Sequence, residues 1–333
     1  MVNIDPRLYP TESAFAERAL FSSAADGDHK KLAELLAQGA DPLARNSRAA
    51  LLASDNGHAG CLALLAPISN LAAIESRALI GAAAKGHTEC VKILISFCNA
   101  KINNSEALRF AASNGHAECV RVLIPRSEPG ALNSEALRCA SRGGHSECVE
   151  LLIPVSNPLA LDSKALFLAA QHGSARCVAL LAPASNPRAD DSCALRAAVR
   201  GRHAECASIL LPLSDVDAAN FQALRFASAE GDVACFRLLF AAIPPALSSE
   251  ALLSDISRLA LLNGHVAVFN ILMELSPNFK ERVDLRAERQ AAIVAKLPEV
   301  AAFLDTLIDE REIEQTLDSP ATPPAKSCGA HRL

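Results

Sequence analysis

Four segments of this chain carry a histidine three residues before a cysteine, in the pattern His-x-Glu-Cys: His87/Cys90, His116/Cys119, His145/Cys148 and His203/Cys206. On a helix, positions i and i+3 lie on one face, so each pair could supply two ligands to a zinc ion. A structural zinc site needs four ligands, and no Cys-x-x-Cys or His-Glu-x-x-His motif supplies the others. The pattern favours a turn histidine beside a buried cysteine, and we expect no metal and no cofactor.

Nucleophilic catalysis by cysteine is the second chemistry to consider. A reactive thiol needs exposure and a lowered pKa. Seven cysteines instead recur at one position of an apolar pattern, each 29 residues after the last: Cys61, Cys90, Cys119, Cys148, Cys177, Cys206 and Cys235. The other four, Cys98, Cys139, Cys193 and Cys328, have no recognisable base beside them, and no phosphate-binding glycine loop is present. We therefore expect a protein that is not an enzyme.

The 29-residue stride indicates a stack of repeats, because a layered core keeps such a period and a catalytic site does not. The segment from Asn103 to Ile124 shows one repeat. Ser105 is placed to cap a first helix with an apolar stripe, and Gly115 ends that helix and reverses the chain. A second helix then starts at His116 and stops at Pro125. Each repeat is a helical hairpin whose neighbours complete its core.

The recurring pattern Ala-Leu-x-x-Ala-Ala-x-x-Gly-His-x-Glu-Cys-Val-x-x-Leu-Ile, with Leu-Leu-Ala-Gln-Gly-Ala-Asp-Pro at residues 35–42, resembles the ankyrin repeat. The resemblance covers about residues 13–277, or about nine repeats. It implies an all-α solenoid and an ankyrin repeat domain over residues 1–277. The family repeat has 33 residues, so we expect its finger-like loops to be truncated to plain turns.

The C-terminal part departs from the repeat. Residues 278–318 are predicted to form an acidic helical cap, and residues 319–333 a disordered tail. From Glu299 to Asp318 seven acidic residues stand against one basic residue. This helix is a solvated cap in the simplest interpretation. Two alternatives are that it folds over a basic stripe of the repeats or recruits a second partner.

An arginine column is the strongest functional signal. Arg109, Arg138, Arg196 and Arg225 occupy the place of a family histidine, and Phe167 interrupts them. The resemblance places Arg142, His172 and Arg200, just before the turn glycines, on the concave groove. Because arginine pairs well with carboxylates and phosphates, these residues predict a site for an acidic protein or peptide. The alternative is that the column arginines hydrogen-bond carbonyls in neighbouring turns.

The composition indicates which kind of partner the protein binds and in which cellular compartment it acts. The net charge of -5 argues against nucleic acid as the main partner. The sequence shows no signal peptide or transmembrane stretch, and the cysteine column favours a reducing, cytoplasmic compartment. Delivery into a host cell stays open. We expect a monomeric protein-interaction module acting as scaffold, adaptor, inhibitor or effector. A substrate-recruiting subunit of a separate enzyme and a self-assembling structural array are the alternatives.

Overall fold

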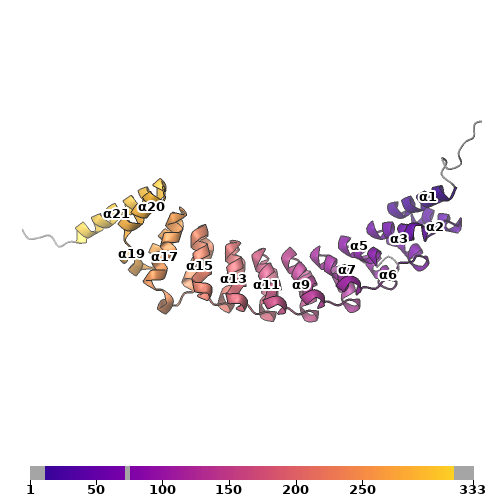
Figure 1. The fold of residues 1–333 in the computed structure, drawn as a ribbon, viewed down its shortest axis with the longest axis horizontal. Coiled ribbons are helices and arrows are strands. Elements are labelled where there is room, and N and C mark those ends of the chain that lie inside the picture. Colours follow the sequence, from indigo (N-terminus) through magenta and orange to yellow (C-terminus); the bar gives the residue numbers. More distant parts are fainter. Residues whose placement is uncertain (1–11, 72–75, 319–333) are drawn as a thin grey trace, which may run out of the picture. The chain divides into compact units, whose positions relative to one another are not determined.

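The computed structural model describes residues 12–71 and 76–318, and every secondary-structure element in this part of the chain is a helix (Figure 1). This confirms the predicted all-α class. Contacts divide the chain into two compact units, Met1–Ala218 and Ala219–Leu333. The domain boundary predicted between residues 277 and 278 stays a prediction, and the predicted disordered tail lies outside the described residues.

The first unit consists of helical hairpins stacked side by side, with the first helix of each hairpin packed against the first helix of the next. The first helices are α1 (Glu12–Asp26), α3 (Ala44–Asp55), α5 (Arg77–Lys85), α7 (Ile102–Ser113), α9 (Ala131–Gly143), α11 (Ala160–Gln171) and α13 (Ala189–Arg200). Their partners are α2 (His29–Ala37), α4 (Ala59–Leu65), α6 (Thr88–Leu94), α8 (Ala117–Leu123), α10 (Ser146–Leu152), α12 (Ala175–Leu181) and α14 (Ala204–Leu210). Two helical layers result.

The core between these layers is built from small and branched side chains at the predicted positions. In one repeat Leu108, Ala111, Cys119 and Leu123 are fully buried, and the same positions are buried in the neighbouring repeats. Most second helices continue into a short 3-10 helix with proline at its second position: η2 (Ala66–Ile68), η3 (Ile124–Arg126), η4 (Ile153–Val155), η5 (Ala182–Ala184) and η6 (Leu211–Leu213). Proline lacks the N–H that a continuing α-helix needs, so the second helix stops there.

The connections between repeats contain a feature that the sequence pattern did not predict. Within α7, Asn103, Asn104 and Ser105 have φ of 50°, 58° and 59°, which makes a three-residue left-handed turn before the right-handed helix. The same turn occurs in α3, α9, α11, α13 and α15 (Ala218–Glu230). Its middle residue is always asparagine or aspartate, the non-glycine residues that adopt this conformation most readily. The middle residues are Asn46, Asn104, Asn133, Asp162, Asp191 and Asn220.

The prediction that Ser105 caps the N-terminus of its helix is wrong. Ser105 is the last residue of the left-handed turn, and its hydroxyl accepts a hydrogen bond from the backbone N–H of Glu128 at 2.7 Å. Equivalent bonds at 2.8–3.0 Å link Ser47 to Asn70, Ser76 to Asn99, Ser134 to Asn157, Ser163 to Asn186 and Ser192 to Asp215. A buried serine thus joins the start of each repeat to the start of the next.

A second ladder runs along the helix-to-helix turns. The Nε2 atom of His116 lies 3.1 Å from the carbonyl oxygen of Ala84 in the preceding repeat. Its ring also lies against Gly86, where a Cβ would meet the Nδ1 atom at 2.6 Å. Gly86 has φ of 80°, so glycine there serves both the turn and the close approach of the ring. His58, His87, His145 and His203 repeat the hydrogen bond to the preceding repeat.

The second unit contains two further hairpins followed by three more helices. Its hairpins are α15 with α16 (Val233–Ala241) and α17 (Glu250–Leu262) with α18 (Val266–Leu275), and η7 (Pro245–Leu247) lies between them. The three helices that follow are α19 (Pro277–Arg282), α20 (Leu285–Val294) and α21 (Pro298–Asp318). Val300 and Leu304 of α21 are buried, and Phe303 meets Phe269 of α18 edge to face at 6.2 Å. Apolar side chains of the last helix therefore pack inside this unit.

The acidic residues of α21 are partly paired within the same unit. Arg286 forms an ion pair with Glu312 at 2.7 Å, and Arg289 pairs with Asp305. Arg311 donates to the carbonyl oxygen of Val283 at 2.9 Å. These contacts attach α21 to α20 and to the residue that follows α19, and the role of α21 as a cap stays a prediction.

Candidate functional site

The predicted arginine column lies on the first helices, and each of its members is bonded to a left-handed turn. Arg109 donates to the carbonyl oxygen of Asn103 at 3.0 Å, and Arg196 to that of Asp190 at 2.7 Å. Arg138 donates through Nη2 to Leu132 at 2.9 Å and through Nε to Asn133 at 3.2 Å. A side chain of the following right-handed helix therefore supplies a hydrogen-bond donor to the carbonyls of the left-handed turn.

These bonds agree with the alternative interpretation, in which the column arginines hydrogen-bond turn carbonyls. The turn that each arginine contacts belongs to its own repeat and not to a neighbouring one. Arg225, in the second unit, follows the rule by donating from Nε to Asn220 at 3.0 Å. A guanidinium has five N–H donors, so these bonds orient the arginines without using all their donors. The structural role and a binding role are therefore compatible.

The column arginines also differ in whether a carboxylate of the protein pairs with them. Nη1 of Arg109 lies 2.8 Å from a carboxylate oxygen of Glu135 in the next repeat, and Arg225 pairs with Asp255. The position equivalent to Glu135 is a base in the following repeat, Lys164, whose ammonium lies 3.8 Å from the centre of the Phe167 ring. Among the described residues no carboxylate pairs with Arg138. Positive charge is thus partly neutralised at α7 and left over at α9.

The residues predicted just before the turn glycines extend this charge. Arg138 and Arg142 stand at i and i+4 of α9, and Arg196 and Arg200 at i and i+4 of α13, so each pair shares one helix face. Arg142, Arg200 and the C-cap residue His172 of the intervening α11 are exposed. The basic face, as we name it, consists of Arg109, Arg138, Arg142, Lys164, His172, Arg196 and Arg200.

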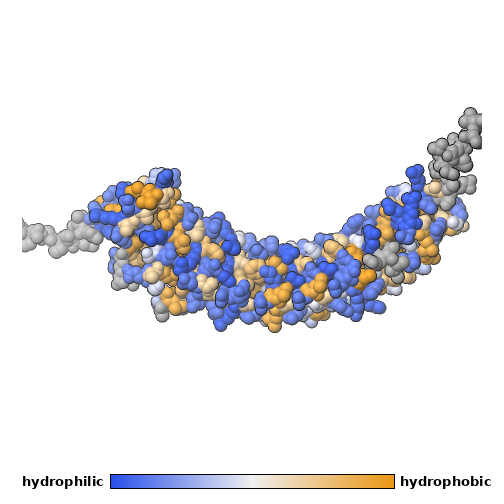
Figure 2. Space-filling view, viewed as in Figure 1, coloured by the Kyte–Doolittle hydropathy of each residue, from blue (hydrophilic) through white to orange (hydrophobic). Residues whose placement is uncertain are grey.

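The basic face belongs to the first unit, and acidic residues lie next to it. The left-handed turns next to it carry Asp162, Asp190 and Asp191. Figure 2 shows hydrophilic and hydrophobic residues interspersed over the visible side of this unit. Arg225, which the sequence placed in the same column, belongs to the second unit. The structure therefore groups six of the seven predicted site residues in one unit, together with Lys164, which the sequence pattern did not predict as a site residue.

The histidine and the cysteine of each His-x-Glu-Cys motif lie in different surroundings. Each histidine ring stands in a turn against the preceding repeat, whereas Cys90, Cys119, Cys148 and Cys206 are buried in the core. This confirms the interpretation of a turn histidine beside a buried cysteine. The part of the chain that the structure describes holds no group of three or more potential metal ligands.

Burial also disfavours the thiolate form of three cysteines outside the buried column. Cys98, Cys139 and Cys193 are half-buried, and burial raises the pKa of each. At Cys139 the nearby Arg142, Arg138 and Arg109 oppose this increase without reversing it. Cys328 lies outside the described residues. A thiol with a raised pKa is protonated near neutral pH and reacts slowly.

The paired helices, their stacking and the serine and histidine ladders define a repeat protein built from helical hairpins. A family model described as ankyrin repeats, three copies, matches residues 50–133, 79–162, 108–191 and 166–246. These matches together span more than half of the chain, and the chain belongs to the ankyrin repeat family. Ankyrin repeats generally serve as modules of protein–protein interaction.

Among solved structures, the human ASB11 ankyrin repeat domain matches with a TM-score of 0.45 and 22% sequence identity, over 68% of this chain and 98% of that chain. A search of curated proteins found no match. Across the described residues, none of the helices combines the length and apolar character required to cross a bilayer.

Proposed function

We propose that this protein is a non-enzymatic interaction module that binds an acidic protein or peptide segment on the basic face of its first unit. One observation carries the proposal: Arg138 and Arg142 form an i, i+4 pair on α9 that no carboxylate of the described residues neutralises. Arginine forks recognise carboxylates and phosphates through paired hydrogen bonds. Arg196, Arg200 and Lys164 extend the charge over the next two first helices.

The geometry supports a preformed site. Arg138 and Arg196 are held by turn carbonyls, so little side-chain freedom is lost when a ligand binds. Arg109 and Arg225 are paired with carboxylates within the protein, which makes them weaker candidates for partner binding than the other column arginines. Arg142, His172 and Arg200 are exposed and provide the variable part of the surface. We further propose action as a monomeric scaffold, adaptor, inhibitor or effector in a reducing compartment such as the cytoplasm, because ten cysteines of the described residues are free.

The test is an affinity capture from the native lysate with the full chain and the Arg142→Glu/Arg200→Glu variant. This variant leaves the turn-bonded Arg138 and Arg196 in place, so folding is preserved. Arg121→Glu/Arg126→Glu is the matched control, because it makes the same charge change on the second helices. Circular dichroism of all three proteins establishes equal helicity.

The proposal expects a partner retained by the wild type and the control, lost by the Arg142→Glu/Arg200→Glu variant, and released as salt increases. If all three proteins retain the partner equally, the basic face does not contribute to the interaction. Loss from the control alone would assign binding to the second-helix layer instead.

A further inference from the structure

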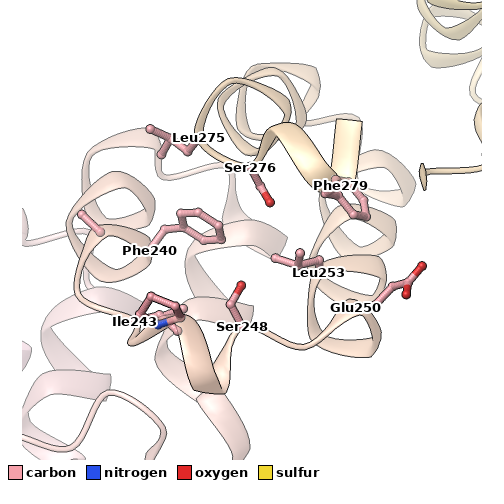
Figure 3. Close-up of a pocket in the computed structure, with 10 residues that line it drawn as sticks. Phe240, Ile243, Ser248, Glu250, Leu253, Leu275, Ser276 and Phe279 are labelled. Carbon is pink, nitrogen blue, oxygen red and sulfur yellow. The ribbon is translucent and has the colours of Figure 1, made fainter. Parts of the chain in front are cut away.

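The second unit contains a cavity of about 480 Å³ between α16, η7, α17 and the α18–α19 junction (Figure 3). Its lining combines aromatic and aliphatic side chains with polar ones, among them Ser248 and Ser276. A mixed lining of this kind fits several classes of ligand equally well. The first unit has a more specific arrangement, a row of like charges at a regular spacing.

The arginine column is interrupted at Phe167, and a neighbouring lysine supplies the missing positive charge. Phe167 on α11 occupies the position that Arg138 holds on α9 and Arg196 holds on α13. The ammonium of Lys164 lies 3.8 Å from the centre of the Phe167 ring, so it stands beside that position. Three successive first helices therefore each carry one positive charge at the level of the column.

Half-buried thiols lie among these charges and show that basic groups of adjacent helices come together. Burial and the nearby Asp190 raise the pKa of Cys193, whereas Arg196 and Lys164 oppose the increase. Lys164 belongs to α11, and the other three residues belong to α13. The Cys139 thiol lies in the same way among arginines of α7 and α9. The charges of neighbouring repeats are thus on one side of the stack.

Ion pairing sets where the row of positive charge begins. Arg109 is neutralised by Glu135 at 2.8 Å, so the row starts one helix later, at Arg138. The basic row, as we name it, consists of Arg138, Lys164 and Arg196, with one member on each of α9, α11 and α13.

The spacing of the basic row follows from helix packing. α9 packs against α11 and α11 against α13, and packed helices lie about 8 to 10 Å apart. A polyproline II segment has three residues per turn and rises about 3.1 Å per residue, so every third side chain lies on one side at intervals of about 9 Å. In a β-strand every third residue instead points to the opposite side of the chain. The polyproline II conformation therefore matches the row.

We propose that the basic row binds an extended segment of a protein partner in the polyproline II conformation, with a carboxylate at every third residue. Each carboxylate would face one member of the row, and Lys164 would be a specificity-determining residue. A polyproline II segment is already extended before it binds, so less conformational freedom is lost. This binding mode rests on the proposed function, because it specifies the acidic segment that the basic face recognises.

The test compares two peptides of identical composition and charge. In acetyl-Trp-Gly-Glu-Pro-Ala-Glu-Pro-Ala-Glu-Pro-Gly-amide, the triplet peptide, glutamate stands at every third residue. In acetyl-Trp-Gly-Pro-Glu-Pro-Glu-Pro-Glu-Ala-Ala-Gly-amide, the doublet peptide, it stands at every second residue. The protein contains no tryptophan, so the anisotropy of the peptide's indole emission reports binding without background. We expect the full-length protein to bind the triplet peptide about fivefold more tightly at low salt, with a smaller difference at high salt.

Substitutions of the middle charge test its role in this preference. Lys164→Gln should weaken binding of the triplet peptide about threefold, with a smaller effect on the doublet peptide, so the ratio of the two affinities falls. Lys92→Gln, at an exposed lysine on the second helix α6, is the matched control and should leave the ratio unchanged. Lys164→Gln/Phe167→Arg places an arginine at the interrupted position and should restore the ratio. Circular dichroism accompanies each variant.

The outcomes separate this binding mode from the proposed function. Equal affinity for the two peptides, with both lost in the Arg142→Glu/Arg200→Glu variant, would overturn the three-residue spacing and leave the proposed function in place. Binding of neither peptide at millimolar concentration would overturn both. An unchanged ratio in a folded Lys164→Gln variant would exclude Lys164 from the site. The comparison on the wild-type chain needs no substitution, so it decides the spacing even if a variant fails to fold.

Discussion

The hydroxyl oxygen of Ser105 lies 2.7 Å from the backbone nitrogen of Glu128 and accepts its hydrogen bond across the boundary between two repeats. The bond joins the end of one left-handed turn to the chain just before the next. Because the same bond recurs from Ser47 to Ser192, the connections between repeats are as regular as the helices. Hydrogen bonds from serine side chains therefore hold the short connections between repeats in place.

Replacement of Ser105 by alanine should destabilise the first unit. The Glu128 N–H would lose its acceptor in a half-buried place, and an unsatisfied group of this kind costs about 1 to 2 kcal/mol. The measurement is the urea midpoint followed by circular dichroism. Ser113→Ala, an exposed serine on the same helix, should change stability by less than about 0.5 kcal/mol. Equal effects of the two substitutions would contradict the role of the serine ladder.

Replacement of Gly115 by alanine should be more harmful than replacement of Gly39. Both have positive φ, which alone costs alanine about 1 to 2 kcal/mol. A Cβ at Gly115 would also meet Nδ1 of His145 at 2.5 Å, whereas nothing lies within 4 Å of one at Gly39. We expect an extra loss of about 1 to 3 kcal/mol at Gly115.

The double variant Gly115→Ala/His145→Ala tests the cause of that extra loss. If the clash with the ring is responsible, the two substitutions are less harmful together than the sum of their separate effects. Strict additivity would mean that the ring moves aside without cost.

Arg138 and Arg142 should differ in stability although they share one helix face. Arg138→Ala leaves two carbonyls of the left-handed turn without their donor, and we expect a loss of about 1 to 2 kcal/mol. Arg142→Ala removes an exposed side chain and should change the free energy of unfolding by less than about 0.5 kcal/mol. Denaturant unfolding of the two variants checks this, and identical stabilities would show that the carbonyl bonds contribute little.

The buried cysteines should make the fold sensitive to alkali. Burial, with smaller effects of neighbouring charges, raises the pKa of Cys90, Cys148 and Cys177 to about 11. Since the folded state disfavours the thiolate, the stability contribution is complete below the ordinary thiol pKa of about 8.5. It is lost as the pH rises through that value toward 11.

Melting temperatures measured from pH 7 to pH 10.5 test this expectation. The comparison protein is Cys90→Val/Cys148→Val/Cys177→Val, because valine already stands at the buried equivalent position, Val268, in the last repeat. The wild type should lose more stability than this variant above pH 9. Parallel curves would show that the thiols do not titrate during unfolding.

Much of the fold could be predicted from periodicity. The 29-residue cysteine stride and the recurring apolar pattern place Cys119 and Leu123 in the core, and the structure buries both. The candidate site was harder to predict. The spacing gave the arginine column, but whether a guanidinium reaches a carbonyl, a carboxylate or solvent depends on the path of the backbone around it. Lys164 and the paired state of Arg109 therefore appeared only in three dimensions.

The sequence by itself determined the hairpin repeat, its apolar core and the family, because burial and helix ends depend on residue types at fixed local spacing. The tertiary structure alone decided what the polar residues do. Ser105 carries the signal of a helix cap, yet in the left-handed turn its hydroxyl lies beside the next repeat and bonds there. Local spacing fixes which face of a helix a side chain occupies, whereas its hydrogen-bond partner is fixed by the neighbouring repeat packed against that face.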